Sequence, residues 1–169
     1  VNVSSALWNS GGCFFEAVQA ALDDSGLAPE RLTLEVTETA VGHAEEDRLC
    51  VDVLGRLRER GIRISIDDFG TGHSNLTRLR RLGFDEIKID RQFVAGIERD
   101  ADDAAVVRAV LGLGLALGLD VVAEGIERSE QACFLARLGC RTAQGFYFAR
   151  PMPLADFARG LETDTAAAG

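Results

Sequence analysis

Hydrophobic and polar residues alternate along this chain with two different periods. Short segments in which every second residue is apolar are typical of strands, and they lie at about 1–4, 32–37, 62–67, 86–90, 119–124 and 142–148. Segments with helical spacing lie at about 12–25, 44–60, 74–82, 101–117, 129–138 and 153–161. Glycines stand where several helices are expected to end, at Gly26, Gly61, Gly118 and Gly139. The chain is therefore predicted to alternate strand and helix throughout.

Repeated strand–helix units predict a parallel sheet, for which two architectures are possible. A doubly wound sheet usually carries a glycine-rich phosphate loop after its first strand, and Ser10-Gly11-Gly12-Cys13 is too weak a match. A (β/α)8 barrel instead collects its functional residues at the ends of many strands, which is the pattern here. Such a barrel takes about 250 residues, whereas this chain has 169. We therefore expect an α/β, TIM-barrel-like (β/α)8 fold that is incomplete, with about six βα units. Because Val1 already looks like part of a strand, we also expect the natural protein to continue upstream.

Composition narrows the class of protein. The net charge of −9 argues against DNA or RNA as a partner, because surfaces that follow phosphates are basic. The longest apolar stretch, Ala109–Leu119, contains three glycines and is far too short to span a membrane, and no signal peptide is visible. None of the four cysteines forms a C-x-x-C pair, so we expect reduced thiols in a cytoplasmic protein.

Charged side chains gather near the ends of successive strands. Strand alternation places Glu35 on the face opposite Leu34 and Val36, and it places Asp67, Lys88 and Glu124 in equivalent positions on their own strands. Each residue taken alone has a common explanation as a turn, surface or loop residue. Their recurrence at equivalent ends of neighbouring strands predicts one shared site inside the barrel.

Carboxylates crowded into one volume either acquire a raised pKa or bind a cation. The oxygen-rich set comprises Asn2, Glu35, Asp67, Asp68 and Glu124. Oxygen ligands suit Mg²⁺ or Mn²⁺ better than zinc. Adjacent Asp67 and Asp68 can serve two ions, and two ions about 3.5–4 Å apart can clamp a phosphodiester for in-line attack. Lys88 can neutralise a phosphoryl oxygen or orient the attacking water.

The segment after the two aspartates, Phe69-Gly70-Thr71-Gly72-His73-Ser74, is expected to be a loop. It lacks the third glycine of a dinucleotide-binding fingerprint. We interpret it as a loop that carries metal ligands and orders when ligand binds. His73 is expected to be a loop or interface side chain, and His43 a surface residue.

At these residues the chain closely resembles the EAL domain family of bacterial cyclic di-GMP phosphodiesterases. The resemblance runs from Val1 to about Leu161, which places an EAL domain at 1–162 and leaves 163–169 as a disordered tail. The matching segments are Val1–Ser4, Glu35–Glu38, Asp67–Gly72, Lys88–Asp90, Val122–Glu127 and Gln144–Phe146.

The resemblance implies hydrolysis of cyclic di-GMP to linear pGpG with two Mg²⁺ or Mn²⁺ ions. By this resemblance Asn2, Glu35 and Asp67 would bind one metal, Asp67 and Asp68 would serve the second, and Lys88 and Glu124 would assist the attacking water. The residues expected to anchor the loop or to complete the substrate pocket are Glu38, Asp90, Glu127 and Gln144.

The chain departs from the family pattern in three places. The Glu-Ala-Leu motif, which supplies a metal ligand, belongs to the strand before Val1 and is absent from this sequence. His73 stands where the family usually has tyrosine, and Asn75 where it usually has serine.

The resemblance also implies a homodimer formed through the 67–76 loop and the following helix, and fusion to diguanylate cyclase (GGDEF) or sensor domains.

Three functions remain open from the sequence. The first is a metal-dependent phosphodiesterase domain, whose catalysis would be severely impaired if the upstream strands were really missing. The second is a catalytically silent cyclic di-GMP receptor or regulatory domain. The third is an unrelated magnesium-dependent barrel enzyme that stabilises an enolate, which Lys88 and the acids alone would permit.

Overall fold

The centre of the molecule is a six-stranded parallel sheet whose strands lie in chain order. The computed structural model describes residues 1–169 except 5–6, 8–11, 39–47, 71–78, 80 and 160–169. Its strands are β1 (Asn2–Val3), β2 (Thr33–Thr37), β3 (Arg63–Phe69), β4 (Glu86–Ile89), β5 (Asp120–Ala123) and β6 (Thr142–Ala143). Strictly sequential parallel order is that of a (β/α) barrel, whereas the order of a doubly wound sheet reverses at a switch point.

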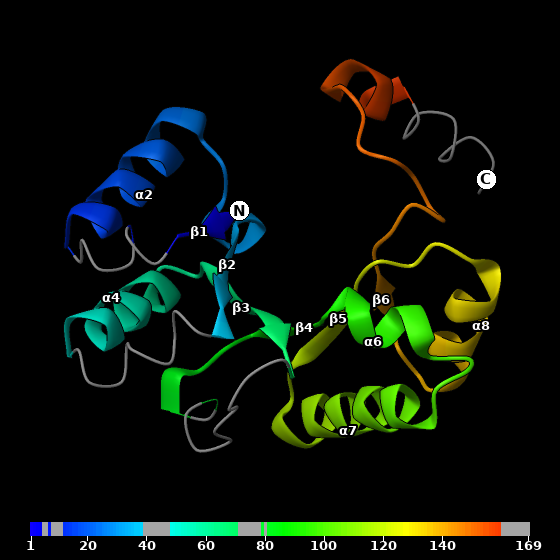
Figure 1. Cartoon of the computed structure of the whole chain (residues 1–169). Coiled ribbons are helices and arrows are strands. Elements are labelled where there is room, and N and C mark those ends of the chain that lie inside the picture. The colour runs from blue at the N-terminus through cyan, green and yellow to red at the C-terminus, as the bar shows by residue number, and fades with distance from the viewer. Residues whose placement is uncertain (5–6, 8–11, 39–47, 71–78, 80, 160–169) are drawn as a thin grey trace.

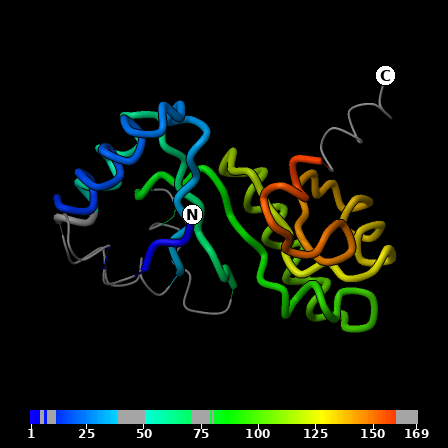
Figure 2. Tube along the Cα trace, turned by 90° about the horizontal axis from the view of Figure 1, so that it is seen from above, coloured from blue at the N-terminus to red at the C-terminus, as the bar shows by residue number. Residues whose placement is uncertain are grey.

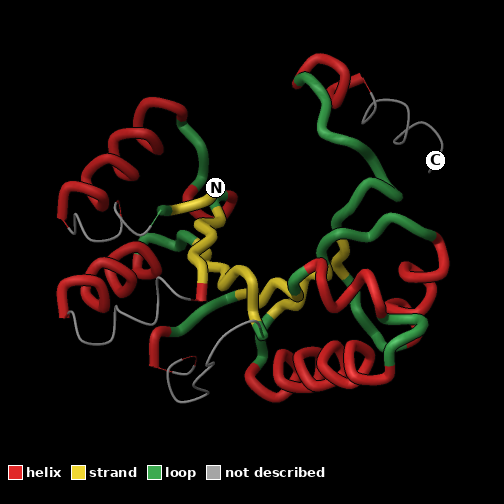
Figure 3. Tube along the Cα trace, viewed as in Figure 1, coloured by secondary structure: helices red, strands yellow, loops and turns green. Residues whose placement is uncertain are grey.

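Helices line the outer side of this curved sheet (Figures 1 and 3). They are α2 (Gly12–Ser25), α4 (Arg48–Glu59), α6 (Arg91–Gly96), α7 (Ala101–Leu117) and α8 (Ser129–Arg137), with a short 3-10 helix, η1 (Pro29–Arg31). Seen from above in Figure 2, the first half of the chain occupies one side of the molecule and the second half the other. No helix in the described part of the chain is long and apolar enough to cross a membrane.

The main core lies between the sheet and the outer helices. Ile64 and Ile66 of β3 and Ile87 and Ile89 of β4 are at most 2% exposed. Each such side chain contributes roughly 1.5–3 kcal/mol through burial. Because strand side chains alternate, the residues between these isoleucines must face the inner side of the sheet. Outward apolar packing thereby determines which polar residues reach the interior.

Two local predictions from the sequence need correction. The strand expected at 142–148 ends at Ala143, and the chain turns at 145–148. A helix not anticipated, α6, follows β4 directly because the carboxylate of Asp90 caps it by accepting a hydrogen bond from the Gln92 amide at 2.7 Å. The expected helix at 74–82 lies largely outside the described residues. His43, His73 and the tail 163–169 lie wholly outside them.

The sheet forms an open arc, as the prediction of an incomplete barrel requires. In the described part of the chain, β1 pairs only with β2, and β6 pairs only with β5. Apolar side chains in the segment that follows β6 are exposed, namely Phe146, Tyr147, Phe148, Met152, Leu154 and Phe157. Both edges would be paired in a closed barrel.

Candidate active site

The predicted cluster of acids surrounds a single buried ammonium group. Lys88 on β4 is 5% exposed. Its Nζ lies 2.6 Å from Glu124 Oε1, 3.0 Å from Glu35 Oε2 and 3.4 Å from Asp67 Oδ1. These residues come from four neighbouring strands or strand ends, β2 to β5. The structure therefore brings together the four residues that strand alternation predicted to share a site.

The charge of Lys88 is held in place by its neighbours. Burial lowers the pKa of Lys88, but hydrogen bonds to Glu124 and Glu35, together with the charges of Glu124 and Asp67, outweigh that effect and raise it. Lys88 is therefore a fixed cation at neutral pH. It can orient or neutralise anionic oxygens, and it is not a free base.

An irregularity in β3 places two consecutive aspartates at the site. In a regular strand Asp67 and Asp68 would face opposite sides of the sheet. The register with β4 shifts between Ile66 and Phe69, and Asp68 has a φ of 57°, in the left-handed region. A bulge of this kind redirects a side chain and is common beside active sites. No pattern in the sequence predicts this bulge.

The Asp68 carboxyl lies in a strongly acidic environment. Burial raises its pKa, and so do a side-chain hydrogen bond with Asp90 and the charges of Asp67, Asp90 and Glu124. The carboxylates around Asp68 therefore carry more negative charge than the single cation Lys88 compensates.

Two further predicted residues lie against the same strand ends. Glu38, 8% exposed, accepts a hydrogen bond through Oε2 from the Gly70 amide at 3.2 Å, and Gly70 lies two residues after Asp68. Asn2 on β1 is exposed, and it is paired in register with Glu35 on β2. Registered neighbours on parallel strands lie on the same face, so Asn2 and Glu35 share the inner side of the sheet.

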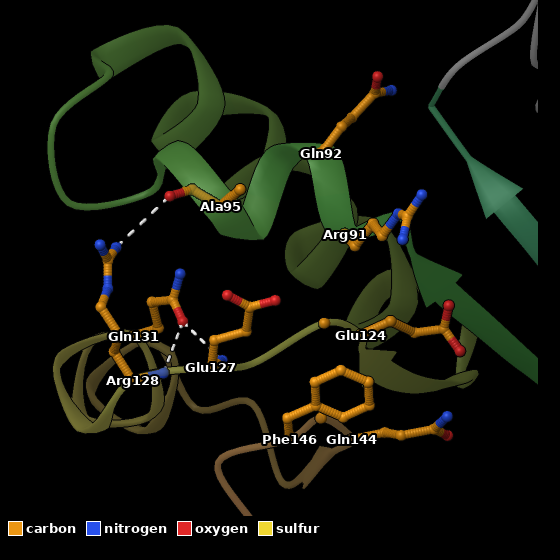
Figure 4. A pocket seen from close by; sticks show the side chains of 11 residues that line it. Arg91, Gln92, Ala95, Glu124, Glu127, Arg128, Gln131, Gln144 and Phe146 are labelled. Atoms are coloured by element: carbon orange, nitrogen blue, oxygen red, sulfur yellow. Dashed lines mark hydrogen bonds between the residues drawn. The ribbon is translucent and has the colours of Figure 1, made fainter. Parts of the chain in front are cut away.

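A cavity of about 450 Å³ opens beside Glu124 (Figure 4). One wall is α6, with Arg91, Gln92 and Ala95. The opposite walls are the 124–128 loop, the start of α8 and the 144–146 segment. The predicted pocket residues Glu127 and Gln144 both line this cavity, as does the half-exposed ring of Phe146.

The sequence reasoning missed several residues of this region. Arg91, Arg128, Gln131 and Phe146 line the cavity but come from turns and helix starts that carry no strand-end signal. Lys88, which strand alternation did predict, carries a further signal, since it is the only lysine in the 169-residue sequence. All other basic residues are arginines, which makes a lone lysine on a strand conspicuous.

The donor chemistry of the site fits a hard divalent cation. All candidate ligands offer oxygen, and the crowded acids around Asp68 are only partly neutralised by Lys88. Within the described residues, however, no three His, Cys, Asp or Glu side chains already converge as they would around an ion. In this structure the Lys88 ammonium lies among the acids.

Comparison with known proteins places this geometry in a family. The EAL domain model matches residues 1–151, and the chain therefore belongs to the EAL domain family. The Pseudomonas aeruginosa protein named bifunctional diguanylate cyclase/cyclic di-GMP phosphodiesterase MucR is 46% identical over 154 residues, covering 90% of this chain and 22% of MucR.

Solved structures agree with the fold. A MucR phosphodiesterase structure in complex with cyclic di-GMP is 43% identical with a TM-score of 0.87, covering 93% of this chain and 62% of that one. Klebsiella pneumoniae BlrP1, solved with manganese and cyclic di-GMP, is 36% identical with a TM-score of 0.82, covering 89% of this chain and 38% of that one. The TIM-barrel-like prediction is confirmed, and this chain spans less than two thirds of each of these relatives.

Proposed function

We propose that this chain carries the catalytic core of a metal-dependent phosphodiesterase that hydrolyses cyclic di-GMP to linear pGpG. The observation that carries the proposal is the buried Lys88 ammonium held by Glu35, Asp67 and Glu124 at the ends of parallel strands. Membership of the EAL family and relatives named as cyclic di-GMP phosphodiesterases supply the substrate class. One water adds across one P–O3′ bond, so that its oxygen joins phosphorus and a proton goes to the leaving 3′ oxygen.

The chain's own residues would bind and orient the reacting groups. Lys88 presents a fixed positive charge that favours the developing negative charge on phosphoryl oxygens. Glu124 pairs with Lys88 and also lines the cavity, so it is placed to hold the attacking water. Glu38 accepts from the Gly70 amide and would fix the position of the segment after Asp67 and Asp68.

Mg²⁺ or Mn²⁺ is the proposed cofactor, as two ions. When bound, these ions supply charge neutralisation and activation of water. Asn2, Glu35 and Asp67 would hold one ion, and Asp67 with Asp68 the other. The manganese in the BlrP1 complex supports this choice.

The cavity between α6 and the 124–128 loop is proposed to receive part of the nucleotide. Arg91 and Arg128 would offer positive charge to a phosphate of the nucleotide. Gln144 would offer amide hydrogen bonds, and Phe146 an aromatic face to a base. Asp90 supports this wall by capping α6.

Partners and location belong to the same proposal. A homodimer through the 67–76 loop and the following helix, fusion to GGDEF or sensor domains and a cytoplasmic location are expected from the family. The bifunctional name of MucR supports the fusion. Sedimentation that gives only monomer at high concentration, with metal and ligand present, would exclude the dimer.

The first experiment is incubation of the chain with cyclic di-GMP and Mn²⁺ or Mg²⁺, with pGpG followed by chromatography. Turnover that disappears in Asp67→Asn would support the phosphodiesterase. Ligand binding without turnover would favour the silent receptor. Absence of both binding and turnover, in a chain that also includes the upstream strands, would overturn the proposal and favour another metal-dependent barrel enzyme.

A further inference from the structure

One buried amide side chain connects two walls of the cavity beside Glu124. Gln131, on the first turn of α8, is 3% exposed. Its Oε1 accepts hydrogen bonds from the Glu127 amide at 2.9 Å and the Arg128 amide at 3.0 Å. Its Nε2 donates to the Val94 carbonyl of α6 at 3.1 Å. Figure 4 shows Gln131 between these two segments.

The two segments are in close contact at further points. Arg128 Nη2 lies 2.5 Å from Glu98 Oε2 and 3.5 Å from the Ala95 carbonyl at the far end of α6. At the near end the backbone of Gly125 approaches so closely that an added Cβ would lie 2.4 Å from the Arg91 Cβ. Gln131 is the buried polar link between these two contacts.

Both segments hold residues of the proposed site. The loop carries Glu124, which pairs with Lys88, and Glu127. Helix α6 begins at its cap Asp90, two residues after Lys88, and Asp90 shares a hydrogen bond with Asp68. A shift of α6 relative to the loop would therefore separate the Lys88–Asp90 side of the site from the Glu124–Glu127 side.

We infer that Gln131 is a positioning residue, a clamp that sets the spacing between α6 and the 124–128 loop and thereby the shape of the cavity for the nucleotide. The identity of the ligand rests on the proposed function. The clamp itself rests only on the hydrogen bonds that Gln131 makes. A simpler role would be a helix cap, since the two accepted bonds satisfy amides at the start of α8. The bond to Val94 is not needed for a cap, and it distinguishes the two roles.

Three variants separate the clamp from the cap. Gln131→Met keeps the size of the side chain and removes all three bonds. Gln131→Glu, studied at pH 8, keeps the acceptors for Glu127 and Arg128 but loses the donor to Val94. Asp85→Ala is the control, because it removes one partly buried bond, from the Ile64 amide at 2.9 Å, at the opposite end of the sheet.

Hydrogen exchange of the 91–96 and 124–128 segments is measured without ligand. Equilibrium binding of cyclic di-GMP is measured with manganese, and KM and kcat where turnover occurs. We expect faster exchange in both segments and about tenfold weaker binding or higher KM in both Gln131 variants, since a buried bond that positions a ligand wall is worth about that factor. Asp85→Ala should lose stability but keep binding and exchange in these segments.

The clamp is wrong if Gln131→Glu exchanges and binds like the unsubstituted chain, because Gln131 would then be only a helix cap. If the unsubstituted chain neither binds nor hydrolyses cyclic di-GMP, the proposed function fails independently. The exchange measurement still decides the clamp in that case, since unchanged exchange in both variants overturns it and faster exchange in both segments supports it.

Discussion

At the scale of single residues, the site is organised around the one lysine of the chain. Three carboxylates lie within 3.4 Å of its Nζ, and their side chains are 16–23% exposed. Like charges at this separation repel strongly unless a cation stands between them. Lys88 therefore has a structural role in addition to any role in catalysis.

Replacing Lys88 by methionine should destabilise the metal-free chain. Removing one partner of a buried ion pair leaves uncompensated charge, and we expect a loss on the order of 2–3 kcal/mol in urea unfolding at pH 7. Because the folded-state pKa of Lys88 is raised above its ordinary value of 10.5, its contribution is complete below that pH and is lost as pH rises further. The difference between the two proteins should thus stay constant from pH 7 to about pH 10.

The matched control is Arg159→Met, which removes an ion pair with Asp156 whose side chains are 75% and 45% exposed. Exposed pairs contribute about 0–1 kcal/mol. Equal losses in the two variants would contradict the structural role of Lys88.

The cysteines should differ in reactivity. Burial raises the pKa of the Cys140 thiol, whereas Cys13 and Cys133 are exposed. Since the thiolate is the reactive form, we expect iodoacetamide at pH 8 to modify Cys13 and Cys133 about tenfold faster than Cys140. Peptide mass spectrometry would measure the rates, and the difference should vanish in urea. Equal rates in the folded chain would show that Cys140 is not protected.

At the scale of elements, most of the barrel arc could be predicted from the sequence. Alternation in β2 to β4 correctly assigned Glu35, Asp67 and Lys88 to one face, because outward isoleucines and leucines leave no other choice. Helix α7 was predicted with its observed bounds, and Gly118 ends it in the left-handed conformation. The hydrophobic period of an element and the residue that caps it depend only on neighbouring positions, so both could be predicted from the sequence.

What could not be predicted depends on contacts distant in sequence. The bulge at Asp67–Asp68 reflects pairing with β4, and the shortness of β6 reflects how the chain turns over Ile126. The Gln131 link joins residues 37 positions apart. No periodic pattern records such contacts.

The turn after β6 should be intolerant of any side chain at Gly145. An added Cβ would lie 2.1 Å from the Ile126 carbonyl oxygen and 2.3 Å from its nitrogen. The same backbone groups bond Gln144 at 3.1 Å and Tyr147 at 2.9 Å. Gly145→Ala should therefore destabilise the chain by about 2–3 kcal/mol and weaken nucleotide binding.

Gly112→Ala is the control for that substitution. Gly112 lies inside α7 with no atom within 4 Å of an added Cβ, so alanine should stabilise the chain by about 0.5–1 kcal/mol. Thermal unfolding of both variants checks the pair. A Gly145→Ala chain as stable as Gly112→Ala would show that the turn relaxes freely.

At the scale of the whole molecule, the open arc is the dominant feature. Strands β1 and β6 each offer an unpaired edge in the described part of the chain, and aromatic side chains at 146–148 are about half exposed. In a closed barrel both edges would be paired. The solved MucR phosphodiesterase chain, of which this chain covers 62%, shows that related proteins contain further structure.

Adding two βα units before Val1, to give the eight of a closed barrel, should therefore change the whole molecule. Both edges would gain partners, so we expect a higher melting temperature and less binding of a hydrophobic dye to the 146–157 surface.

The added strand would also bring the glutamate that the family resemblance assigns to the metal site. Hydrolysis of cyclic di-GMP should then rise by about 100-fold or more over the 169-residue chain, since even a residue that only supports a metal ligand is worth roughly 10–100-fold in metal affinity or activity. The control is the extended chain with that glutamate changed to glutamine, which should keep the gain in stability and lose the gain in rate. If the extension stabilised neither the fold nor the activity, the edges of β1 and β6 would have to be covered in another way, and a second copy of the chain would be the occupant to look for by sedimentation.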